Sequence, residues 1–180
     1  MLWPPRNNAA METAWQFQLN LVPWQVFFHL SFRALTPSVN ARVARVKRLV
    51  RAIAGYYKVC EDDLAYVVRL ENGEITGRPH AHMLLSRLPR SGGSTSSCMV
   101  YKNWWNKIAG NAVVKPFRPD LAGVAYLTDG LSDYNAGNQY EMRKFGSADA
   151  IVVSPMARME MLRARAFGRP QFATTASRAG

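Results

Sequence analysis

The sequence predicts an α+β fold in which helices pack against an antiparallel sheet of about five strands. Strand-like and helix-like stretches follow one another in the order strand, helix, two strands, helix, strand, which is a split βαβ arrangement. A chain of 180 residues with 48% hydrophobic residues can bury one good core, so one domain is expected. We therefore interpret residues 1–14 as a loose N-terminal leader, and residues 15–180 as a single domain that ends in a basic helix and tail.

The first strand and the first helix are predicted from composition and periodicity. Residues 27–32, which include His29, are rich in β-forming side chains and are expected to form a central strand. Thr36 and Pro37 are typical of a helix start, and Gly55 can end that helix. Apolar residues at alternating spacings of three and four form one stripe along it: Val43, Val46, Val50, Ile53 and Tyr57. Basic residues crowd its remaining surface: Arg42, Arg45, Lys47, Arg48 and Arg51.

A β-hairpin is predicted over residues 64–88. An apolar run that ends at Glu71 and a second run that begins at His80 are joined by a connector rich in turn residues. The following residues 90–97 are mostly Ser and Gly, so a flexible loop is expected there.

A short helix and a further strand complete the predicted fold. Val100, Trp104 and Ile108 lie four residues apart and form an apolar stripe, and Gly110 can end this helix. Residues 112–115 are expected to form a strand that Pro116 interrupts. The two adjacent tryptophans of the helix are expected in the core more than on a surface that stacks against bases.

The hairpin is predicted to bring two histidines and one carboxylate together. His80 and His82 are two residues apart, so a strand places both imidazoles on one face. Glu71 ends the preceding strand and is expected to lie nearly opposite His80. Imidazole and carboxylate ligands suit a divalent metal ion, and rigid strands hold such ligands well. A bare His-x-His pair is more often a pair of surface residues, but the facing Glu71 reverses that expectation.

Composition and charge point to a polyanionic partner. The chain carries 23 Lys and Arg residues against 12 Asp and Glu residues, a formal net charge of +11, which favours nucleic acid or an acidic membrane surface. No apolar run approaches the ~20 residues of a membrane span, and no secretion signal is recognisable. Cys60 and Cys98 are far apart and lack metal-type spacing, which indicates a reducing compartment. We expect the protein to be cytoplasmic, with no membrane partner.

The block formed by Glu71 and residues 76–82 resembles the metal-binding motif of the HUH endonucleases, in which a hydrophobic residue separates two histidines. The similarity is closest to replication initiators of small phages and rolling-circle plasmids, and it spans roughly residues 26–145. The resemblance implies a ferredoxin-like or RRM-like sheet and a sequence-specific, single-stranded DNA endonuclease and strand-transferase. It also implies a divalent metal, Mn²⁺ or Mg²⁺, held by Glu71, His80 and His82, and a tyrosine that attacks DNA.

Tyr126 is the first candidate for that tyrosine. A helix over residues 121–131, capped by Asp120, would cluster its apolar side chains on one side and place Tyr126 nearly opposite. Residues 124–128 also resemble the family's third motif, in which a lysine follows the tyrosine by three residues. Asp129 stands at that position here, so the local cation that the family uses near the scissile phosphate is missing.

Two other tyrosines stay open as nucleophiles. Tyr140 is followed by Arg143 and Lys144, and Lys144 is a candidate to supply the missing cation. Tyr134 lies in a loop-like stretch with few other signals.

The expected partner is single-stranded DNA or an origin hairpin. A DNA-binding role is predicted for seven basic residues: Arg42, Arg45, Lys47, Arg48, Arg51, Arg78 and Arg143. The chain has no phosphate-binding Gly-x-x-x-x-Gly-Lys motif, so a helicase would have to be a separate host protein, and no small-molecule cofactor is expected. Two alternatives remain: a non-catalytic, RRM-like nucleic-acid-binding module, and a single-tyrosine transposase or relaxase of the same superfamily.

Overall fold

The computed structural model describes residues 15–33, 38–72, 78–121, 123–128, 141–143 and 150–167. The predicted α+β fold with an antiparallel sheet and flanking helices is confirmed. The strands are β1 (Val26–Ser31), β2 (Ala65–Asn72), β3 (Pro79–Ser86), β4 (Ala112–Pro116), β5 (Glu141–Arg143) and β6 (Ala150–Val153). The helices are α2 (Val39–Tyr57), α3 (Thr95–Ile108), α4 (Gly123–Thr128) and α5 (Pro155–Phe167).

The strand order β4-β1-β3-β2-β6-β5 contains the predicted split βαβ unit. Its first four strands lie in the order β4-β1-β3-β2, and every pairing between them is antiparallel. Helices α2 and α3 make the two crossovers of this unit. The sheet has six strands in place of about five, because β6 and the three-residue β5 extend it beyond β2.

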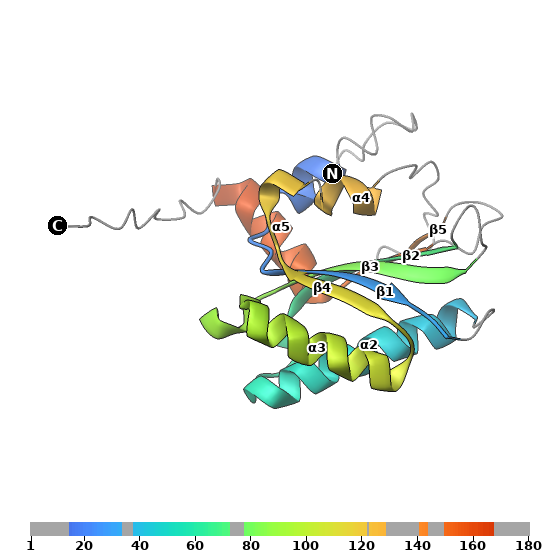
Figure 1. Cartoon of the computed structure of the whole chain (residues 1–180). Helices are drawn as coiled ribbons and strands as arrows, with labels where there is room; N and C mark the ends of the chain where they lie inside the picture. The colour runs from blue at the N-terminus through green and yellow to red at the C-terminus, as the bar shows by residue number, and fades with distance from the viewer. Residues whose placement is uncertain are drawn as a thin grey trace.

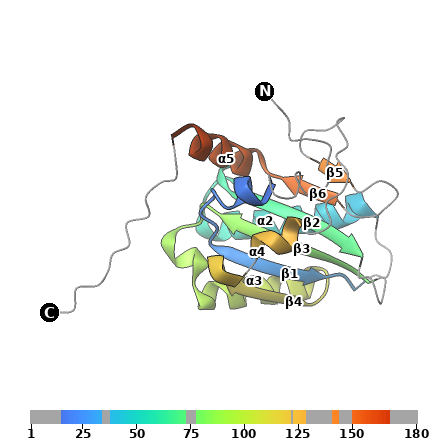
Figure 2. The same ribbon diagram turned by 90° about the horizontal axis from the view of Figure 1, so that it is seen from above.

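Two hydrophobic cores lie on the two faces of this sheet. Figure 1 shows α2 and α3 on one face and α4 and α5 on the other. Because side chains alternate along a strand, Leu70 and Met83 belong to the core under α2 and α3, whereas Val67 and Leu84 belong to the core under α4 and α5. Viewed onto the second face in Figure 2, α4 lies across the central strands and α5 lies farther along the sheet.

The apolar stripe predicted for α2 is confirmed, but both predicted helix ends need correction. The described helix begins at Val39, and its N-cap is Ser38, whose hydroxyl accepts a hydrogen bond from the amide of Ala41 at 3.2 Å. The predicted start at residues 36–37 lies outside the described residues. Gly55 does not end the helix: the chain continues to Tyr57, whose hydroxyl bonds to Ser97 and Tyr101, and Lys58 takes the left-handed conformation instead.

The prediction that Arg42 lies on the surface of α2 was wrong. Arg42 is 2% exposed, and its guanidinium donates to the backbone carbonyl of Glu71 at 3.2 Å, below the end of β2. The long side chain is thus used to hold a strand end. Lys47, Arg48 and Arg51 are exposed as expected, and Arg45 is half-buried.

Residues 90–97 do not form the predicted loop. They form a short 3₁₀ turn, Arg90–Gly93, followed directly by the first turn of α3. The serines that suggested flexibility act as caps: the Ser94 hydroxyl accepts from the amide of Ser97, and the Ser97 hydroxyl donates to the carbonyl of Ser91 at 2.8 Å.

The buried stripe of α3 is shifted by one residue from the predicted one. Cys98, Tyr101 and Trp105 are buried, while Val100 is only half-buried. Trp105 is fully enclosed in the core, as predicted for a tryptophan at this place, and its indole N–H donates to the carbonyl of Ser31 at 3.0 Å. This bond ties α3 to the end of β1.

Gly110 follows α3 at a point where two backbone segments nearly touch. A Cβ atom at this position would lie 2.1 Å from the carbonyl oxygen of Ser31. Only glycine permits this approach without displacing β1.

The helix predicted over residues 121–131 is shorter in the described chain. A 3₁₀ turn, Pro119–Leu121, precedes α4, and the carboxylate of Asp120 pairs with Arg118 at 2.7 Å, so it is not the predicted helix cap. Val124 and Thr128 are buried, as the predicted apolar side requires, whereas Leu121 is exposed.

Candidate metal centre

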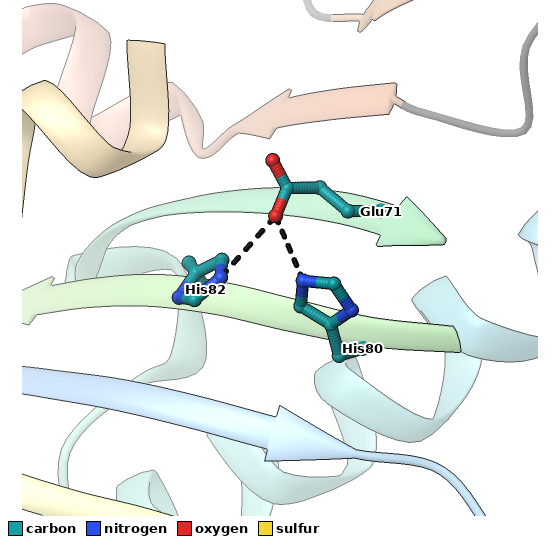
Figure 3. Close-up of side chains that lie close together, drawn as sticks. All are labelled: Glu71, His80 and His82. Atoms are coloured by element: carbon teal, nitrogen blue, oxygen red, sulfur yellow. Dashed lines mark hydrogen bonds and ion pairs between the residues drawn. The ribbon is translucent and has the colours of Figure 1, made fainter. Parts of the chain in front are cut away.

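Glu71, His80 and His82 converge at one end of the sheet, as the hairpin predicts. The β2–β3 register pairs Glu71 directly with His80. One carboxylate oxygen of Glu71, Oε2, lies 2.9 Å from Nε2 of His80 and 3.2 Å from Nε2 of His82 (Figure 3). The donor atoms of the three residues lie within 4.8 Å of one another. This group could hold a metal ion.

The protonation of these residues suits metal binding. Burial alone would raise the pKa of the Glu71 carboxyl, but hydrogen bonds from both histidines and an adjacent guanidinium outweigh burial and hold the pKa well below its usual range. The ring atom Nδ1 of His80 lies 3.3 Å from the backbone carbonyl oxygen of Arg78. In this structure Nε2 of His80 donates to Glu71. In the other tautomer the proton lies on Nδ1 and can be donated to the Arg78 carbonyl, and Nε2 is then free to bind a metal. One carboxylate and two imidazoles form a donor set that fits a divalent transition metal.

Two arginines hold Glu71 from opposite sides of the sheet. Arg69 lies two residues earlier on β2, so it shares the face of Glu71 and forms an ion pair with the second carboxylate oxygen, Oε1. Arg42 reaches the backbone carbonyl of Glu71 from the other face. The ion pair to Oε1 leaves Oε2 facing the histidines.

His29 is a third histidine at this centre, and the sequence analysis assigned it no role there. The β1–β3 register pairs it with His82, and its ring centroid lies 4.7 Å from that of His82 and 5.4 Å from that of His80. Burial lowers the pKa of His29, and so do the charges of the two neighbouring histidines, against the opposing effect of Glu71. His29 is not part of the close donor group. Its ring packs against the rings of His80 and His82 instead.

Tyr126 lies beside the same group. Its ring centroid is 4.9 Å from that of His82, and the residue is 61% exposed, so its side chain sits at the border between the cluster and solvent. The expected position off the buried side of α4 is confirmed. The backbone carbonyl of Tyr126 accepts a hydrogen bond from Arg69 at 3.4 Å.

Several other predicted site residues cannot be placed relative to this centre, because the described part of the chain does not include them. Tyr134, Tyr140, Lys144 and Asp129 lie outside the described residues, as does the side chain of Arg143. Arg78 is exposed at the start of β3, near the histidines. The basic residues of α2 belong to the helix layer on the opposite face of the sheet (Figure 1).

Searches for similar proteins returned no match: no family model, no curated protein and no solved structure resembles the chain closely enough to be reported. Among the residues that the structure describes, no helix is both long and apolar enough to cross a membrane.

Proposed function

We propose that this protein is a metal-dependent, single-stranded DNA endonuclease and strand-transferase with Tyr126 as its nucleophile. The observation that carries the proposal is the contact between an exposed tyrosine and a partly buried metal-type cluster: Tyr126 lies against His82, which faces Glu71. A phenol at such a border can reach a bound phosphate while its ring is held by the cluster. The resemblance to HUH replication initiators, seen in the hairpin motif, favours the same chemistry.

The metal would be held by Glu71, His80 and His82. When bound, a divalent ion supplies positive charge that offsets the negative charge of a phosphodiester and so permits attack by an anionic oxygen. Mn²⁺ suits the mixed imidazole and carboxylate donors, and Mg²⁺ is the other candidate in cells.

The covalent step follows from the phenol. The Tyr126 oxygen forms a bond to phosphorus, and its proton passes to solvent. The bond from phosphorus to the 3′ oxygen breaks, and this oxygen takes up one proton to become a 3′-hydroxyl. The product is a 5′-phosphotyrosine ester, which conserves the energy of the broken bond, so attack by a 3′-hydroxyl rejoins the strand without a nucleotide cofactor.

Initiation of rolling-circle replication of a plasmid or phage is the role that this chemistry and the initiator-like motif favour. Origin DNA, single-stranded or in a hairpin, would be the substrate, and a host helicase would separate the strands. The strong positive charge of the chain is consistent with such a substrate. A transposase or relaxase role would use the same covalent step.

A purely binding role is less well supported. RRM-like sheets bind bases on an open face with aromatic side chains. In the described part of this chain, the face that carries the histidines is covered by α4, α5 and residues 19–24, which form the second core with Val67 and Leu84. A face covered in this way offers little area for stacking bases.

The test is formation of a covalent adduct. With Mn²⁺ and a pool of single-stranded oligonucleotides, the protein should form a species that survives denaturing electrophoresis, because an ester persists when the fold is lost. Tyr126→Phe should abolish it, and a metal chelator should do the same. Tyr56→Phe is a matched control, because Tyr56 is 58% exposed but lies on α2, on the other face of the sheet.

Other outcomes redirect or refute the proposal. An adduct that survives Tyr126→Phe but is lost in Tyr140→Phe would assign the nucleophile to Tyr140. If the wild type binds the pool but forms no adduct under any metal condition, the protein is a binding module.

A further inference from the structure

Arg69 touches both halves of the proposed site. It is 7% exposed, it pairs through Nε with Oε1 of Glu71, and it donates through a terminal nitrogen to the backbone carbonyl of Tyr126.

The bond to Tyr126 joins the helix that carries the proposed nucleophile to the sheet. The described part of helix α4 is Gly123–Thr128, and it packs on the sheet through Val124 and Leu127. A donor on β2 therefore helps to set the height and the rotation of α4 above the sheet.

An arginine suits this position because it is planar and has donors in several directions. One guanidinium can bond the carboxylate through one nitrogen and the carbonyl through another, whereas a lysine ammonium is a compact point charge on a flexible stem. Arg69 is buried and two of its nitrogens already contact Glu71 and Tyr126, so it is unsuited to bind the scissile phosphate in place of the missing lysine at position 129.

We infer that Arg69 is a positioning residue that couples metal binding at Glu71 to the placement of Tyr126. This inference rests on the proposed function. Metal binding that orders Glu71 should therefore also order α4. By thermodynamic linkage, an ordered α4 should in turn strengthen metal binding.

The first measurement is Mn²⁺ affinity by calorimetry, which requires no DNA. Arg69→Met keeps much of the side-chain length but removes the charge and all donors, and it should weaken Mn²⁺ binding by about 10–100-fold, as loss of a residue that orients a ligand does. Arg69→Lys should recover part of that affinity because a positive charge remains beside Glu71. The matched control is Arg87→Met, since Arg87 also bonds one carboxylate and one carbonyl, those of Glu160 and Asp63, away from the histidines.

The second measurement is amide hydrogen exchange of residues 123–128 with and without Mn²⁺. In the wild type and in Arg87→Met, Mn²⁺ should slow exchange in α4. In Arg69→Met and Arg69→Lys it should not, because neither side chain can bridge the carboxylate and the helix. Arg69→Lys also serves if Arg69→Met fails to fold. Equal slowing in the wild type and in Arg69→Lys would overturn the inference.

The third measurement is the adduct rate at saturating Mn²⁺. Both Arg69 variants should remain slower than the wild type by up to about 100-fold, since a displacement of about 1 Å has an effect of that order. Full recovery of the rate at high Mn²⁺ would show that Arg69 acts on metal affinity alone and would overturn the coupling. If the wild type forms no adduct, the proposed function fails, while calorimetry and hydrogen exchange still decide whether Arg69 couples the carboxylate to α4.

Discussion

The two faces of the sheet are built from the same strands but have different tasks. On the face toward α2 and α3, side chains such as Leu70 and Met83 are fully enclosed. On the face toward α4, the adjacent residues of the same strands are Glu71 and His82. These two side chains lie beyond the apolar core, in the polar cluster at one end of the sheet. Both faces thus carry an apolar core, but only the face toward α4 also carries the polar cluster at its end.

This division means that substitutions on one strand should separate stability from chemistry. A residue on the α2 and α3 face should affect folding and leave the metal centre intact once the protein is folded. A residue at the polar end of the other face should affect metal or DNA chemistry more than folding. Four experiments test this separation, from the largest expected effect to the smallest.

The largest effect is expected from Met83→Ala. Met83 is 0% exposed in the core, so its truncation should lower the free energy of unfolding by about 2–5 kcal/mol. His80→Ala, three residues earlier on the same strand but on the other face, should lower it by at most about 1 kcal/mol, because the ring is partly exposed. Urea unfolding followed by circular dichroism measures both. Equal losses would contradict the separation of the two faces.

Metal affinity should depend on the histidines far more than on the core residue Met83, which is the reverse of the order expected for stability. The double variant His80→Ala/His82→Ala should lose more than about 100-fold in Mn²⁺ affinity by calorimetry, since even residues that only orient ligands contribute 10–100-fold. His29→Ala is the control, because His29 touches both rings but lies outside the close donor group. Its loss should be below about tenfold, and a loss as large as that of the double variant would make His29 a ligand.

Acid should weaken metal binding through the histidines and not through the carboxylate. A proton and a metal ion compete for the same imidazole nitrogen, so affinity should fall by roughly tenfold or more between about pH 7.5 and pH 5.5. The pKa of Glu71 is held below its usual range, so this carboxylate stays ionised throughout that interval. Mn²⁺ titrations at three pH values measure the effect. An affinity that does not change over this range would argue against imidazole ligands.

The smallest effect is expected from the basic residues of α2. Binding of single-stranded DNA should weaken by at least about tenfold between about 50 and 200 mM salt, because contacts with phosphates release counterions. Lys47→Ala/Arg48→Ala should weaken it only a few-fold, since this helix lies on the face away from the histidines. Fluorescence anisotropy at both salt concentrations measures this. If the DNA affinity of the double variant hardly changes with salt concentration, the main DNA-binding surface lies on α2.

Much of the fold could be predicted because it depends on local patterns. The stripe of α2 and the hairpin have clear periods of about 3.6 and 2 residues, and the order of the elements leaves few topologies. The facing of Glu71 and His80 followed from the short connector between their strands. The predictions that were wrong, such as the helix end at Gly55 and the loop at residues 90–97, rested on composition where tertiary contacts decide the outcome.

The site residues that the sequence did not predict depend on contacts between segments that are distant along the chain. His29 joins the centre only because β1 pairs with β3 in one register, and nothing local in residues 26–31 encodes that register. Arg69 could have been found, since it is two residues from Glu71 and a strand places both on one face. Arg42 could not, because its burial depends on where α2 crosses the end of β2.

The close approach at Gly110 has a consequence for how this protein tolerates genetic change. Ser31, whose carbonyl a Cβ at position 110 would strike, is the strand partner of His80. Any mutation of Gly110 would therefore push on the strand that aligns a ligand, from a residue outside the group of metal-type ligands. In a random library selected for loss of metal binding, codon 110 should be recovered along with the codons of the ligands themselves.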